Sequence, residues 1–243
     1  MVEKGIYEID INGKYGWMGH YAFVTGYDEA NKTIIYQDSY QPKGSPPGPD
    51  RKIEYQKFID GWRAFNYIFI VVYPVERERD VLNLLGGMRD EETTNRHALE
   101  IAQKESLSLT GIDRYFAWFN IGTSHVALHE YADASVAYDQ AFSVYADLNE
   151  ESTIRPYRMI WYQTGPYFAY YYSNRFTDVI NLATLTLGVR PDPDLEESLL
   201  WRGRAYYMTG QTLLAIDDYR TALKIHPNWL PAVQALQDLG VQP

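Results

Sequence analysis

The sequence contains no cysteine among its 243 residues. This absence excludes disulfide bonds, thiolate metal sites and a cysteine nucleophile within these residues, and it leaves the redox compartment open. The phosphate-binding pattern Gly-x-x-x-x-Gly-Lys, the Gly-x-Ser-x-Gly elbow and the His-Glu-x-x-His metal motif are also missing. We therefore predict no cofactor.

Long apolar runs and an excess of positive charge are missing as well. The best apolar run, residues 67–75, has the length of a strand, so no membrane span is predicted. The start, Met-Val-Glu-Lys, does not resemble a signal peptide, although export of a longer parent protein stays open. The formal net charge is -10, and such a surface repels phosphate backbones, so no nucleic-acid partner is expected.

A hairpin signal stands out near the start of the chain. Residues 19–28 and 32–39 are rich in aromatic and β-branched residues, and a short polar segment separates them. His20 lies in the first run and Asp38 in the second.

The length of the hairpin loop decides whether these two side chains meet. A loop of three residues places His20 opposite Asp38, and a loop of five places Asp38 opposite Ala22, one diagonal step from His20. A loop of four would put the two side chains on opposite faces, because a slip of one residue inverts the pleat. We predict one of the first two registers, since a carboxylate beside an imidazole is the orienting half of a catalytic triad.

The rest of the first 76 residues predicts further strands and one helix. Residues 5–12 alternate as in a strand, and residues 13–19 and 42–50 are predicted loops because of their glycines and prolines. Aromatic spacing over residues 53–62 predicts a short amphipathic helix. Residues 67–73 are almost entirely apolar, which predicts a strand covered on both faces.

The pattern Gly-His-Tyr-x-x-Val-x-Gly-Tyr-Asp, from Gly19 to Asp28, is followed by a strand ending in Asp38. With the helix and the final apolar strand, it resembles the C-terminal half of papain-superfamily peptidases, especially the double-glycine-peptidase-like group of bacteria. The resemblance implies that His20 is the base and Asp38 the orienting acid, and Trp17 or Trp62 would wall the cleft. The half of that family's domain that carries the nucleophilic cysteine and the oxyanion-hole glutamine has no counterpart here, so this chain alone is expected to be inactive.

From residue 77 to residue 243 the composition shifts to helix-forming residues, so two domains are predicted, 1–76 and 77–243. Two segments share one spacing: a glycine, an alanine twelve residues later, an aromatic four after that and a second alanine three further on. These residues are Gly122, Ala134, Tyr138 and Ala141 in the first segment, and Gly203, Ala215, Tyr219 and Ala222 in the second. The spacing resembles the tetratricopeptide repeat, in which small residues permit close helix contact beside an aromatic ring.

Between these segments, residues 158–187 form a degenerate copy, in which Pro166 should break the first helix. A last helix is predicted from residue 229 or 231 to 239. The predicted fold class is therefore α+β: a small antiparallel sheet, half of a papain-like domain, followed by a helical repeat array.

Repeat arrays of this kind offer a concave groove for an extended peptide or a partner helix. The candidate groove residues lie on the first helices of the repeats: Arg114, Asn120, His125, Arg158, Tyr162, Tyr167, Tyr171, Arg202 and Tyr206. Core packing is the competing interpretation for each tyrosine. His125 and His129 lie one turn apart without a third ligand at matching spacing, so no metal site is predicted.

Three hypotheses follow. The first is the C-terminal part of a cysteine-peptidase-like protein whose helices bind a peptide or protein. The second is a non-catalytic interaction scaffold, and the third is a protein that binds a carbohydrate or other small ligand through its tyrosines. Because a half-domain sheet exposes apolar surface, a homodimer through residues 5–75 is also expected.

Overall fold

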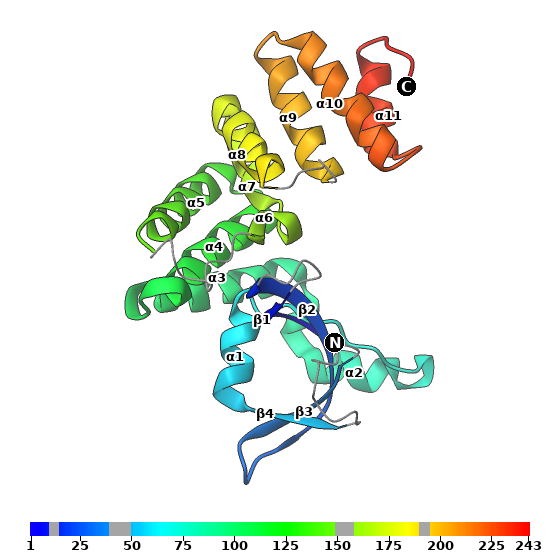
Figure 1. Ribbon diagram of the computed structural model, residues 1–243. Helices are drawn as coiled ribbons and strands as arrows, with labels where there is room; N and C mark the ends of the chain where they lie inside the picture. The colour runs from blue at the N-terminus through cyan, green and yellow to red at the C-terminus, as the bar shows by residue number, and fades with distance from the viewer. Residues whose placement is uncertain (10–14, 39–49, 149–157, 190–194) are drawn as a thin grey trace. The chain divides into compact units, whose positions relative to one another are not determined.

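The computed structural model describes residues 1–9, 15–38, 50–148, 158–189 and 195–243. The fold is α+β, with a four-stranded antiparallel sheet first and helices after it (Figure 1). Residues 1–130 and 136–159 form one compact unit, and residues 131–135 and 160–243 form a second. The last strand ends at residue 54, before the domain boundary predicted at residue 76, which stays a prediction.

The sheet is a meander in the order β1-β2-β3-β4. Its strands are β1 (Val2–Ile9), β2 (Tyr15–Asp28), β3 (Thr33–Gln37) and β4 (Arg51–Glu54). The predicted loop over 13–19 is wrong from residue 15 onward, because these residues pair with β1. The sequence did not predict β4, and residues 42–49 of the predicted proline-rich loop lie outside the described part of the chain.

The predicted loop of three or five residues between β2 and β3 is wrong. Asp28 pairs with Thr33, so four residues form the loop, and this register alone would separate His20 from Asp38. A register shift between Val24 and Gly26 then inserts one extra residue into β2. Beyond this bulge Phe23 pairs with Gln37, which continues to Asp38 opposite Ala22 and restores the predicted face.

Helix α1 (Tyr55–Arg63) covers one face of the sheet (Figure 1). Phe58 packs with Val2 and Ala22 in a small core, which partly buried apolar side chains of β2, β3 and β4 surround. Gly61 permits the close approach of α1 to β1, since a Cβ there would lie 2.8 Å from the Gly5 carbonyl oxygen. The helix predicted over 53–62 is therefore confirmed with a shift of about two residues.

Residues 67–73 are not the doubly covered strand that the sequence predicted. Only a single bridge, Val2 to Phe69, joins this segment to β1, and the backbones of Met1 and Ile70 exchange two hydrogen bonds. Ile70 and Val72 are 51% and 66% exposed. Apolar composition predicted burial, but no second layer of the described chain covers this segment.

The helices of the first unit follow in chain order. They are α2 (Glu78–Leu85), α3 (Glu91–Ser108), α4 (Gly111–Ala127) and α5 (Tyr131–Ala146), with short 3₁₀ turns η1 (Val75–Arg77) and η2 (Gly86–Arg89). Asp90 caps α3 by accepting a hydrogen bond from the Thr93 amide. Leu99, Ala102, Ile121 and Ala137 form the core that joins α3, α4 and α5.

The second unit contains the remaining helices. They are α6 (Met159–Tyr162), α7 (Gly165–Tyr172), α8 (Phe176–Gly188), α9 (Glu196–Met208), α10 (Thr212–Ile225) and α11 (Leu230–Asp238). Pro166 lies in the first turn of α7, and the first helix of the degenerate copy is broken before it, as predicted. The predicted last helix is also confirmed by α11.

The repeated spacing of small and aromatic residues has the predicted physical basis. A Cβ at Gly122 would lie 2.6 Å from Tyr138, and one at Gly203 would lie 2.5 Å from Tyr219. The alanines of both patterns are buried. In each pair the second helix therefore lays a tyrosine ring directly on the glycine of the first. Within the described part of the chain, no helix combines the length and apolar character that a membrane crossing requires.

Candidate functional site

His20 and Asp38 meet on the sheet face that α1 covers. The His20 Nε2 atom lies 2.6 Å from Asp38 Oδ1, and the two side chains are 16% and 5% exposed. Because a carboxylate can only accept, the proton of this hydrogen bond belongs to Nε2. The predicted juxtaposition of the two side chains is confirmed.

Two cations and a phenol surround this pair. Arg51 on β4 places Nη1 4.0 Å from Asp38 Oδ2, so the carboxylate faces an imidazole on one oxygen and a guanidinium on the other. Lys4, which pairs with His20 in the β1–β2 register, is buried and lies 5.1 Å from the centre of the Tyr36 ring. Burial raises the pKa of Tyr36, and the charge of Asp38 raises it further, while Arg51 opposes this rise.

Arg51 and Lys4 are site residues that sequence reasoning missed. Arg51 lies on β4, which the sequence did not predict. The four residues Arg-Lys-Ile-Glu are too few to show the alternation of apolar and polar residues that indicates a strand. Lys4 lies one residue before the predicted strand 5–12 and pairs with His20. A prediction of the β1–β2 register would have placed Lys4 beside His20.

The tryptophans proposed as cleft walls have different surroundings. Trp17 is 1% exposed and stacks between Phe65 and Phe116, with ring centres 5.7 Å and 5.9 Å away. That prediction is corrected for Trp17, because a fully buried ring cannot line a cleft. Trp62 is partly exposed and donates its indole hydrogen to the Ile68 carbonyl at 2.7 Å.

Two of the candidate groove residues on the helices belong to the interior. Tyr167 is fully buried, and its hydroxyl lies 3.0 Å from Ser198 Oγ. Asn120 is also fully buried and donates to the Arg63 carbonyl at 2.7 Å. Both predictions are corrected: these residues lie on the helix face that packs on neighbouring elements.

Other candidates serve as links between helices or remain accessible. Arg202 donates two hydrogen bonds to Asp218, at 2.7 Å and 2.8 Å, and thereby joins α9 to α10. Tyr206 packs beside the core of α9, α10 and α11. Arg158 is buried, at 9% exposed, so the groove prediction is corrected for it as well. Tyr162 is 41% exposed, and Tyr171 is half-buried at an open pocket.

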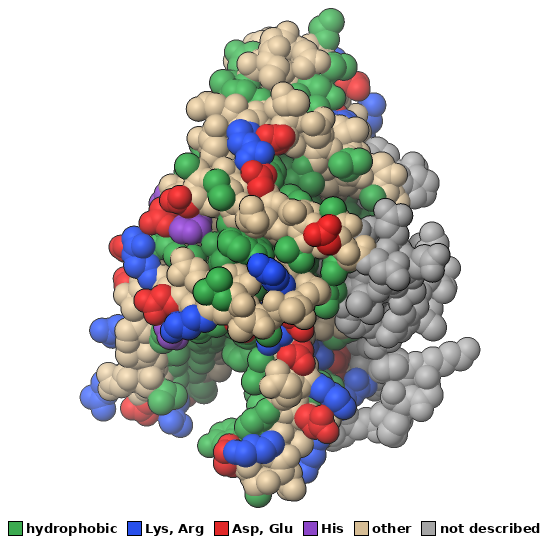
Figure 2. Space-filling model, turned by 90° about the vertical axis from the view of Figure 1, so that its left-hand side faces the viewer, with side chains coloured by type: hydrophobic (Ala, Val, Ile, Leu, Met, Phe, Trp, Pro, Cys, Tyr) green, Lys and Arg blue, Asp and Glu red, His purple; other side chains and the backbone are tan. Residues whose placement is uncertain are grey.

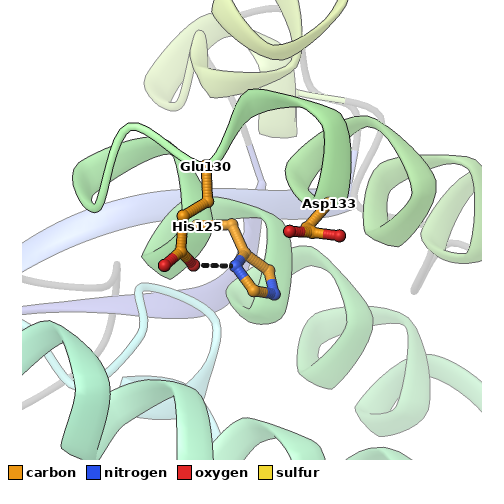
Figure 3. A group of neighbouring side chains, drawn as sticks. All are labelled: His125, Glu130 and Asp133. Carbon is orange, nitrogen blue, oxygen red and sulfur yellow. Dashed lines mark hydrogen bonds and ion pairs between the residues drawn. The ribbon is translucent and has the colours of Figure 1, made fainter.

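His125 pairs with a carboxylate and not with His129. Its Nδ1 lies 2.7 Å from Glu130 Oε2, as Figure 3 shows, with Asp133 in the first turn of α5. Arg96 also contacts Glu130, at 3.4 Å. The hydrogen bond from the Glu130 amide to the His125 carbonyl closes the same turn, so this pair has a structural role between α4 and α5.

Charge is mixed on the face of the described residues that Figure 2 draws. Figure 2 shows positive and negative side chains interspersed on one face, with hydrophobic side chains exposed between them.

No protein-family model matches the sequence, and no curated protein matches it.

Proposed function

We propose that this chain is the base-bearing part of a cysteine-peptidase-like protein whose helices bind a peptide or protein partner. The observation that carries the proposal is the 2.6 Å hydrogen bond between His20 and Asp38 on adjacent antiparallel strands. His20 would accept the thiol proton at Nδ1, and Asp38 would hold the imidazole in the required tautomer and orientation.

The surroundings of the pair support an orienting role for Asp38. Its carboxylate is 5% exposed, and Arg51 faces its second oxygen, so the carboxylate is kept in place from two sides. A carboxylate that is fixed in this way stabilises the imidazolium that forms when a nucleophile is deprotonated. The nucleophile must come from outside these 243 residues, because they contain no cysteine.

The tautomer of His20 tests the first part of the proposal. Nitrogen-15 NMR of the imidazole at alkaline pH should show the proton on Nε2, as the hydrogen bond to Asp38 requires. The substitution Asp38→Asn keeps the shape of the side chain but removes its charge. In this variant the preference of His20 for the Nε2-protonated tautomer should weaken. A His20 tautomer that is the same in both proteins would contradict an orienting role for Asp38.

Activity is tested on the polypeptide that the complete gene encodes. We expect peptide cleavage that a thiol-alkylating reagent blocks, and a loss of about 10³-fold or more in His20→Ala, since the base is needed to form the thiolate. His226→Ala is the matched control, because that histidine is exposed on the second unit. Cleavage that His20→Ala leaves unchanged would reject the peptidase assignment.

A second candidate function is a non-catalytic interaction scaffold. The absence of cysteine favours it, together with the hydrogen bonds of Arg63, Asn120 and Tyr67, which attach α1 and the turn after it to α3 and α4. On this reading the His20–Asp38 pair stabilises the sheet. Asp38→Asn would then lower stability and leave partner binding unchanged.

A further inference from the structure

The second unit contains an open pocket between α9 and α11 whose walls are mostly apolar and aromatic. Its volume is about 550 Å³, within the usual range for ligand pockets. Tyr207 and Met208 of α9, Leu230 and Leu239 of α11, and Tyr171 of α7 form much of the lining. Tyr207 and Met208 are each 49% exposed and Leu230 is 76% exposed, so apolar surface is accessible to a ligand here.

Arg204 brings a positive charge into this pocket. Its guanidinium lies 4.7 Å from the centre of the Trp201 ring, which orients it, and among the described residues no carboxylate forms an ion pair with it. Arg202, two residues earlier on α9, by contrast donates two hydrogen bonds to Asp218. The charge of Arg204 reaches the pocket wall, since it opposes the rise that burial causes in the pKa of Tyr171 and Tyr219.

The opposite wall carries the other polar groups. Gln234 donates to Asp238 Oδ1 at 2.7 Å, and both residues line the pocket. The carboxylate of Asp238 can accept hydrogen bonds from the N–H groups of a ligand. Its negative charge disfavours a ligand that carries several negative charges. A ligand that fits both walls has one carboxylate, several N–H donors and an apolar body.

We propose that this pocket binds an acidic peptide segment, with a peptide carboxylate at Arg204 and a neighbouring apolar or aromatic side chain among the tyrosines. This site deepens the proposed function, and it rests on the part of that proposal in which the helices bind peptide. It shares Tyr171 with the sequence-based groove but differs from it on α9, because Arg204, Tyr207 and Met208 lie on a different face of that helix from Arg202 and Tyr206.

A library of blocked nonapeptides tests the assignment, with a central Asp or Asn and Phe, Tyr or Leu beside it. The full chain should select members with Asp, and the dissociation constant of the best binder should rise about tenfold in Arg204→Gln, as expected for loss of a charge-assisted hydrogen bond. Arg220→Gln is the control, because it removes the same charge from an exposed position on α10 outside the pocket. Arg204→Lys should retain part of the affinity.

Nuclear magnetic resonance locates the binding and confirms that each variant is folded. Amide shifts of Tyr207, Met208 and Gln234 should change with the Asp peptide, and less in Arg204→Gln. An Asn peptide with a free C-terminal carboxylate shows whether the chain end or a side chain supplies the acid. Equal affinity for Asp and blocked Asn peptides, or no binding, overturns this site.

The two proposals fail in distinguishable ways. Peptide binding that Arg204→Gln leaves intact rejects the pocket but keeps peptide binding by the helices. Loss of the His20–Asp38 effects described above rejects the peptidase assignment and leaves the pocket unaffected.

Discussion

At the scale of single residues, two glycines set how closely the helix pairs approach. A Cβ at Gly203 would lie 2.5 Å from the Tyr219 ring, inside the contact distance of two carbons. We expect Gly203→Ala to lower the free energy of unfolding by about 1–3 kcal/mol, the usual cost of overpacking. Gly188→Ala is the control, since no atom lies within 4 Å of its added Cβ, and it should be neutral or stabilise by about 0.4–1 kcal/mol. Urea denaturation measures both, and equal effects would contradict the packing argument.

Glu3 gives a prediction for pH dependence. Burial raises the pKa of this carboxyl above 4.5, and the hydrogen bond from Tyr21 only partly offsets the rise. The folded protein therefore binds this proton more tightly than the unfolded chain does, so the contribution of Glu3 to stability falls as pH rises through and above 4.5. Glu3→Gln should stabilise the protein at pH 7, and the gain should vanish in denaturation measured below about pH 4. A gain that persists at acid pH would show a cause other than ionisation.

At the scale of elements, Arg63 at the end of α1 holds the sheet against the helices. It is 5% exposed and donates to Glu105 at 3.0 Å and to Asp113 at 2.9 Å. Burial acts to lower the pKa of Arg63, but the hydrogen bond to Glu105 and the electrostatic effects of Tyr67, Glu105 and Asp113 together outweigh it and raise the pKa. Tyr67 also donates a hydrogen bond to Glu105, so this carboxylate on α3 accepts hydrogen bonds from both Arg63 and Tyr67.

Removing this arginine should uncouple the elements. We expect Arg63→Ala to destabilise the protein by about 3 kcal/mol, because it leaves Glu105 partly buried without its cation. Arg77→Ala is the matched control, since Arg77 and its partner Asp80 are 65% and 59% exposed, and surface pairs contribute about 0–1 kcal/mol. Hydrogen exchange should show faster exchange in the sheet of the Arg63 variant. Unchanged sheet protection would contradict this role.

At the scale of the whole molecule, the exposed apolar segment 68–72 predicts self-association. Val72 is 66% exposed, and the segment lies beside β1, the edge strand of the sheet. Exposed strand edges with apolar side chains favour pairing between chains. We expect a concentration-dependent dimer in analytical ultracentrifugation that Val72→Lys weakens. Leu107→Lys, at an 85% exposed position on α3, should leave the dimer intact, and a strictly monomeric wild-type chain would contradict the expectation.

Features that depend on neighbouring residues could be predicted from the sequence alone. Turn residues and β-propensity located the β2–β3 hairpin, the glycine and tyrosine spacing located two helix pairs, and Pro166 located a helix break. These signals extend over a few residues or recur at a fixed spacing, so they can be recognised in the sequence. The pairing of His20 with Asp38 was also predicted, although the predicted loop length was wrong.

Features that depend on residues far apart in the chain could be found only in the folded protein. The bulge between Val24 and Gly26 compensates for the four-residue loop, and neither feature has a clear local signature. Burial of Trp17 and Tyr167 follows from helices and strands that come from elsewhere in the chain, whereas residues 68–72 stay exposed because no described element covers them. A hydrophobic side chain favours burial, but the arrangement of the other elements determines whether it is buried.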